Sequence, residues 1–179
     1  MSKNVLLISA SLRARSNSEA LAKAFMEGAE AGGNKAELVT LKNKQIAFCK
    51  GCLACQKLGH CVINDDAGLI AQKMEQADVI VFATPVYYFS MAGQLKTLLD
   101  RANYLFSTDY KFRDIYVLTA AAEDEPTTPE KTVMAIEGWV ECFANARLAD
   151  SVFAGGVTDM GEIEGHKELK EAYEMGKNI

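Results

Sequence analysis

The stretch DVIVFATPVYYFSMAGQLKTLLDRANYLF, residues 78–106, contains one complete unit of strand, loop and helix. Its first seven residues, DVIVFAT, are the most strand-like run in the chain, because apolar and β-branched side chains follow one another without a polar break. A strand that is apolar on both faces is typical of a parallel sheet covered by helices on each side. A helical period begins at Met91, after a loop rich in aromatic residues.

The same alternation continues along the whole chain. Strands are predicted over 4–9, 36–41, 78–84, 114–120 and 150–156, and helices over 17–33, 65–77, 91–106, 128–147 and 165–176. The pattern predicts an α/β fold of three layers, with a five-stranded parallel sheet between two layers of helices. We expect the doubly wound strand order 2-1-3-4-5, in which ligands bind beyond the carboxyl ends of the strands where the winding reverses.

Length and composition narrow the class of protein. The 179 residues, 49% hydrophobic and 24% charged, suit a single domain spanning 1–179. A net charge of −5 with scattered Lys and Arg argues against nucleic acid as a partner. The apolar runs are too short to cross a bilayer, and the N-terminal apolar stretch is followed by a polar segment instead of a cleavage site. We therefore expect a cytoplasmic protein without a membrane partner.

The loop after the first strand reads SASLRARSNSEAL, residues 9–21. It contains neither a dinucleotide-binding GxGxxG nor a GxxxxGK[ST] loop, but it carries hydroxyls and arginines into a helix N-terminus, which suits a phosphate monoester. Its candidate ligands are Ser9, Ser11, Arg13, Ser16, Asn17 and Ser18. The alternative is that Ser16 and Glu19 form an ordinary capping box.

Three motifs carry a resemblance to a known family. S-x-R-x-x-S-N-S, residues 11–18, resembles the phosphate loop of the NADPH-dependent FMN reductase superfamily. Residues 77–101 resemble the second flavin loop and following helix of multimeric flavodoxin-like proteins, and CKGCLACQKLGHCVINDD (49–66) resembles the cysteine segment of the iron–sulfur flavoprotein branch. The likeness covers about residues 4–120. It implies a flavodoxin-like, FMN-binding domain.

Two further loops then acquire a role at the flavin. An isoalloxazine ring needs apolar and aromatic walls, which the loop after the third strand offers. The candidates there are Pro85, Val86, Tyr87, Tyr88 and Phe89, and those after the fourth strand are Thr119, Ala120 and Ala121. The resemblance implies that backbone N–H groups of the latter loop face the flavin. The alternatives are that the aromatic side chains pack under the next helix or in a dimer interface, and that the alanines fill the core.

The cysteines are the most unevenly distributed residues of the chain. Four of the five, Cys49, Cys52, Cys55 and Cys61, follow the spacing C-x2-C-x2-C-x5-C in a long loop. Such spacing suits a [4Fe–4S] cluster. Zinc fits less well, although His60 is adjacent, and a metal-free loop or a redox disulfide is an open alternative. We expect Cys142 to lie in the core, and Lys96, Asp100 and Arg101 to be surface charges.

Together these features predict an FMN-dependent oxidoreductase, an NAD(P)H-dependent FMN or quinone-type reductase that passes electrons through bound FMN. The alternatives are an iron–sulfur flavoprotein or a flavodoxin-like electron carrier without pyridine-nucleotide reductase activity. Because the flavin carries the chemistry, no acid–base residue is assigned. The electron acceptor, a small molecule or a redox protein, is not specified by any motif. The resemblance also implies a homodimer or homotetramer.

Overall fold

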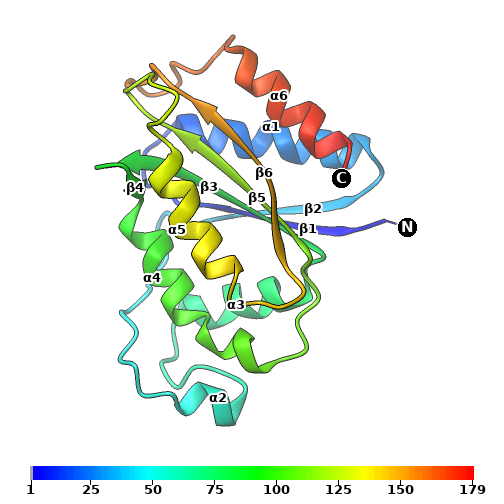
Figure 1. Ribbon diagram of the computed structural model, residues 1–179, viewed down its shortest axis with the longest axis vertical. Coiled ribbons are helices and arrows are strands. Elements are labelled where there is room, and N and C mark those ends of the chain that lie inside the picture. The colour runs from blue at the N-terminus through cyan, green and yellow to red at the C-terminus, as the bar shows by residue number, and fades with distance from the viewer. Residues whose placement is uncertain (1) are drawn as a thin grey trace.

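The computed structural model describes residues 2–179, which fold around one sheet (Figure 1). Its strands are β1 (Asn4–Ser9), β2 (Lys35–Thr40), β3 (Val79–Tyr87), β4 (Ser90–Met91), β5 (Asp114–Ala120) and β6 (Arg147–Ala154). The order across the sheet is β2-β1-β3-β5-β6, with every pairing on this path parallel. The expected doubly wound order is therefore confirmed. The one addition is β4, a two-residue strand that pairs antiparallel with the end of β3.

Helices cover both faces of the sheet. They are α1 (Asn17–Ala31), α2 (Ala54–Leu58), α3 (Asp66–Gln76), α4 (Gly93–Arg101), α5 (Glu130–Val140) and α6 (Lys167–Lys177), with a 3₁₀ helix over Asn103–Ser107. In Figure 1, α1 and α6 lie on one side of the sheet, α3, α4 and α5 on the other, and α2 projects from the sheet. No helix among residues 2–179 is long and apolar enough to cross a membrane.

Each face of the sheet has its own apolar core. Leu7 of β1 and Val81 of β3 point to the α1 side, where they pack with Phe25 of α1. Ile8 and Phe82 point to the opposite side, toward α3, α4 and α5. All five side chains are fully buried. The alternation along apolar strands is what a parallel sheet with two covered faces requires.

The helices α1 and α6 cross at glycines. A Cβ on Gly28 or Gly176 would overlap backbone atoms of the other helix, at Tyr173 and Phe25 respectively. The two backbones therefore touch, and only glycine permits this approach. The crossing fixes the last helix of the chain against the first.

Two predicted helices are shorter than expected. The helix predicted over 91–106 ends at Arg101 and continues as a 3₁₀ turn, which buries Tyr104 and Leu105. The helix predicted over 128–147 ends at Val140, where the chain turns so that Phe143 packs edge-on against Phe112 before β6 begins. In both cases burial of an apolar or aromatic side chain overrides the local helical period.

Candidate functional site

The three predicted flavin loops begin at one edge of the sheet. Strand pairing places Ser9 beside Ala83, Pro85 beside Ala120, and Ala120 beside Ala154. The chain leaves β1, β3 and β5 just beyond these positions, so the three loops follow neighbouring strand ends. This is the edge at which open α/β sheets bind their ligands.

The loop after β1 enters α1 through a capped N-terminus. The Ser16 side chain accepts a hydrogen bond from the backbone N–H of Glu19 at 3.2 Å, so the capping interaction is present. The Ser16 and Ser18 hydroxyls lie 3.2 Å apart, and Ser9 donates to Glu19 at 3.2 Å. The hydrogen bonds found within residues 2–179 include none donated by the backbone N–H of Asn17 or Ser18. The start of α1 thus retains donors of the kind that bind phosphate oxygens.

The same loop is anchored by a segment from the end of the chain. The Asn17 amide donates to the carbonyl of Asp159 at 2.9 Å and accepts from the N–H of Ile163 at 3.3 Å. The Arg13 guanidinium donates to the Thr158 carbonyl at 2.8 Å. Sequence reasoning missed this segment, because its only signal is a glycine-rich loop after β6.

The aromatic loop after β3 is a tight hairpin. Tyr87 pairs with Ser90, so Tyr88 and Phe89 are the two turn residues, and both have positive φ, 50° and 59°. Such a turn ordinarily contains Asn and Gly. The Tyr88 side chain is fully exposed, while the amino group of Lys131 lies 5.4 Å from the centroid of the Phe89 ring. The backbone of this hairpin tip is strained, and one aromatic ring is presented to solvent.

The remaining predicted flavin residues lie at the ends of β3 and β5 and are partly or fully buried. The Thr84 hydroxyl accepts from the N–H of Ala92 at 3.0 Å and so ties β3 to the start of α4. Pro85 and Val86 are partly buried, whereas Thr119, Ala120 and Ala121 are buried. The Ala121 N–H donates to the Ala154 carbonyl at 3.0 Å, so this particular N–H already has an acceptor.

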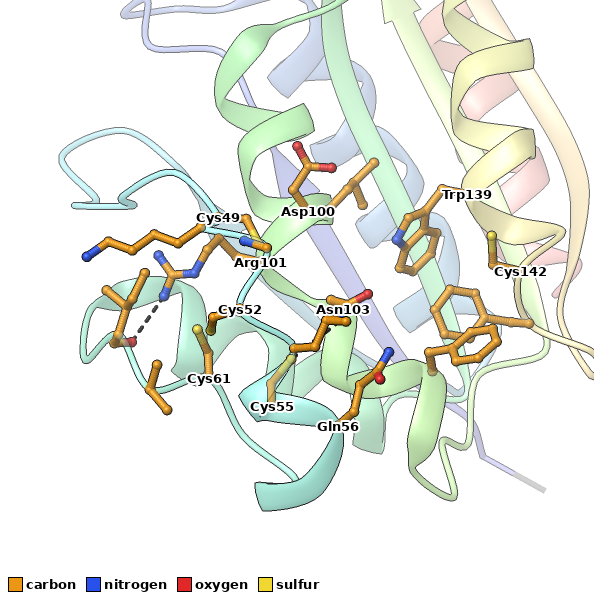
Figure 2. A pocket seen from close by; sticks show the side chains of 18 residues that line it. Cys49, Cys52, Cys55, Gln56, Cys61, Asp100, Arg101, Asn103, Trp139 and Cys142 are labelled. Carbon is orange, nitrogen blue, oxygen red and sulfur yellow. Dashed lines mark hydrogen bonds between the residues drawn. The ribbon is translucent and has the colours of Figure 1, made fainter.

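The four clustered cysteines line one cavity of about 700 Å³ (Figure 2). Cys49 and Cys52 are exposed, and Cys55 and Cys61 are partly buried. The short helix α2, absent from the sequence prediction, carries Cys55 and ends at Leu58, where Gly59 caps it with a positive φ of 70°. The cavity lies between this loop, the end of α4 and the end of α5, and its lining includes no residue of the predicted flavin loops.

The sulfur atoms of this loop have N–H donors beside them. The backbone N–H of Gly51 donates to Cys49 Sγ at 3.4 Å, and the Asn103 amide donates to Cys55 Sγ at 3.4 Å. Within the described chain, however, no three His, Cys, Asp or Glu side chains lie close enough together to hold a metal ion. The four thiols are of the kind that ligates an iron–sulfur cluster and they share one cavity, but they would have to draw together to bind it.

Two sequence expectations near this cavity are wrong. Arg101, expected on the surface, has no exposed side-chain area, because it forms an ion pair with Asp65 at 2.6 Å under the cysteine loop. Cys142, expected in the core, is exposed and lines the cavity, because α5 ends before it and Phe143 takes the buried position. Lys96 and Asp100 are exposed and paired at 2.6 Å, as predicted.

The environment of Asp65 favours its charged form. Burial alone would raise the pKa of this carboxyl, but hydrogen bonds from Arg101 and from the N–H groups of Ala47 and Ala67 hold the pKa below its usual value. The same hydrogen bond from Arg101 to Asp65 raises the pKa of the guanidinium. At neutral pH the two side chains thus form a charge-assisted pair at the base of the cysteine loop.

Comparison with known proteins shows which family this chain belongs to. The family model described as NADPH-dependent FMN reductase matches residues 3–134, which contain all three predicted flavin loops and the cysteine segment. The chain belongs to the NADPH-dependent FMN reductase family. It is 32% identical over 152 residues to an iron-sulfur flavoprotein of Methanosarcina thermophila, covering 84% of this chain and 80% of that one. Membership of this FMN reductase family makes the chain an FMN-dependent oxidoreductase that uses NAD(P)H.

Solved structures agree on the fold of this FMN reductase family member. An NAD(P)H:quinone oxidoreductase from Methanothermobacter marburgensis superposes with a TM-score of 0.78 at 20% identity, covering 99% of this chain and 96% of that chain. An azoreductase from Bacillus anthracis str. Sterne superposes with a TM-score of 0.72 at 15% identity, and each chain is covered completely. The flavodoxin-like architecture is therefore confirmed.

Proposed function

We propose that FMN binds at the sheet edge formed by the loops after β1, β3 and β5, with its phosphate at the start of α1. The single observation that carries this proposal is the pair of unaccepted N–H groups at Asn17 and Ser18, beside the buried hydroxyls of Ser11, Ser16 and Ser18. A helix N-terminus with free donors stabilises a phosphate dianion. Bound FMN supplies hydride acceptance from NAD(P)H and onward electron transfer.

We assign the side chains of the loops after β3 and β5 to binding of the isoalloxazine ring. Pro85 and Val86 offer a partly buried apolar edge, and Tyr87 and Phe89, each 48% exposed, offer ring faces for stacking. The small Ala120 and Ala121 leave room for close approach of a flat group. Asn17 and Arg13 act on the phosphate loop by fixing it to residues 158–163.

We place a second copy of the chain over the open side of the ring. Tyr88 is fully exposed and Tyr87 and Phe89 are half-exposed, so a ring bound against this hairpin has one face toward solvent. A neighbouring subunit in a homodimer or homotetramer excludes water from that face.

FMN titration of the flavin-free protein tests the proposed site. Flavin fluorescence reports binding, and Ser18→Asp, which places a carboxylate where the phosphate would lie, is expected to weaken binding at least tenfold, about 1.4 kcal/mol. Ser107→Asp, at a hydroxyl in the 3₁₀ turn, is the matched control and should bind as the parent does. Equal affinities for the parent and Ser18→Asp would place the phosphate elsewhere.

We further propose that Cys49, Cys52, Cys55 and Cys61 hold a [4Fe–4S] cluster. The proposal is supported by the four thiols that share one cavity, by the N–H donors at the sulfurs of Cys49 and Cys55, and by the M. thermophila relative's name. A cluster held there would supply one-electron transfer.

Anaerobic purification, followed by iron, sulfide and FMN assays on one sample, tests the cluster proposal. About four irons per chain are expected, and Cys52→Ser should lose them while retaining FMN. Cys142→Ser, at the fifth cysteine of the same cavity, is the control that should keep its iron. Flavin without iron in the parent protein would leave a metal-free reductase with a thiol loop.

A further inference from the structure

The largest fully buried side chain of the protein belongs to an arginine beneath the cysteine loop. Arg101 ends α4, and its guanidinium lies under a segment whose own side chains are mostly exposed. A buried guanidinium is costly unless its donors find acceptors, so each of its N–H groups has to be accounted for.

Four of the five N–H groups close the cysteine loop at its base. Nη1 donates to the Ala47 carbonyl at 2.7 Å and to Asp65 at 2.6 Å, and Nη2 donates to the Ile63 carbonyl at 3.0 Å and to Asp65 at 2.9 Å. Ala47 precedes the first cysteine of the loop, whereas Ile63 and Asp65 follow the last. One side chain therefore joins the two ends of residues 48–62 and removes much of their freedom.

The fifth N–H has no acceptor. Arg101 Nε is buried and unpaired, although the residue lines the cavity together with the four clustered cysteines. Figure 2 shows Arg101 on the same side of the cavity as Cys49 and Cys61. The Arg101 guanidinium, which is always charged and has one unpaired N–H, thus borders the cavity that the four clustered cysteines line.

We propose that Arg101 is a positioning residue for the cysteine cavity, which closes the loop over residues 48–62 and reserves Nε–H and its charge for a sulfur ligand there. This inference rests on the cluster proposed above and adds a residue outside the cysteine motif. A cluster held by four thiolates is negatively charged and becomes more so on reduction. The nearby guanidinium therefore favours the reduced cluster and raises its reduction potential.

A pair of variants tests the guanidinium of Arg101 after its ion pair with Asp65 has been removed. Asp65→Asn and the double variant Asp65→Asn/Arg101→Gln both lose the ion pair, and they differ only in the guanidinium. Both are reconstituted with iron and sulfide as FMN-bound protein, and the cluster midpoint is measured by redox titration followed by electron paramagnetic resonance. We expect the double variant to have the more negative midpoint, by about tenfold in the reduction equilibrium, or about 59 mV for one electron.

Each result of this experiment has a defined meaning. Equal midpoints in the two variants would overturn the role of Arg101 while leaving the cluster in place. A parent protein that takes up no iron would overturn the cluster and this inference together. If Asp65→Asn does not fold, Arg101→Lys and Arg101→Gln give the same comparison, because both lose the planar fork and only one keeps the charge. Hydrogen exchange over residues 48–62 should be faster in Arg101→Gln than in the parent, and unchanged exchange would overturn the loop-closing role.

Discussion

Replacing Tyr88 with asparagine should make the flavin-free protein more stable and its flavin affinity lower. Tyr88 has a φ of 50° and is fully exposed, so its side chain has little packing to lose. A non-glycine residue in this left-handed region costs about 1–3 kcal/mol, and asparagine tolerates the conformation better than tyrosine does. We expect a gain of about 1 kcal/mol, which for a chain of this size raises the melting temperature by about 2–4 °C.

The assay is thermal unfolding of the flavin-free protein, with FMN titration of the same preparations. Tyr87→Asn makes the same chemical change at the neighbouring strand position, which does not have a positive φ, and it should destabilise because a half-exposed strand tyrosine is lost. FMN affinity should fall by up to about tenfold in Tyr88→Asn, from the loss of ring contact worth about 0.5–1.5 kcal/mol. A melting temperature at or below that of the parent would refute the strain argument, and unchanged affinity would remove Tyr88 from the flavin site.

Three further changes test the frame around the site. Gly28→Ala should destabilise the protein by about 3 kcal/mol in urea unfolding, because the new methyl group overlaps the backbone of Tyr173. Its control, Gly138→Ala, faces open space in α5 and should stabilise the protein by up to about 1 kcal/mol. Similar free energies of unfolding for the two variants would contradict the close helix crossing. Ser16→Ala removes the cap of α1 and should cost about 1 kcal/mol in thermal unfolding, a loss that disappears if Glu19 N–H finds another acceptor. The folded pKa of Asp65 lies below its unfolded value of 3.8, so the stabilisation from its charged form is complete above pH 3.8 and is lost as the pH falls through the folded pKa. The free energy of unfolding of Asp65→Asn should therefore fall less steeply than that of the parent below about pH 4. Equal slopes for the two proteins would refute the pairing.

Local pattern was sufficient to predict the sheet and most of its helices. Runs such as Val79–Ala83 are fully buried on both faces of the sheet, and their uninterrupted apolar sequence is typical of such a buried strand. The predicted boundaries failed where tertiary packing decides, as at Phe143, whose burial ends α5 early. The flavin residues remain predictions at the positions that the loop motifs indicated.

The site features that escaped sequence analysis all depend on long-range partners. In the sequence, Arg101 looks like any other charged residue on the surface of a helix. Only the folded chain brings Asp65 and the carbonyl of Ala47 within hydrogen-bonding distance of its guanidinium. The anchoring of Asn17 by Asp159 joins positions 142 residues apart. No periodicity or short motif encodes such pairings, because each joins residues far apart in the sequence that only the folded chain brings together.

The return of the chain to its beginning has a consequence for how the protein is made. Translation produces the phosphate loop among the first twenty residues, but the residues that anchor it, Thr158 to Ile163, are added only after β6. The apolar side of α1 around Phe25, which packs against α6, likewise stays uncovered until α6 has left the ribosome. A nascent chain that has completed all the proposed flavin loops still lacks the support that holds the first of them. Cofactor loading is therefore expected to follow synthesis rather than to accompany it.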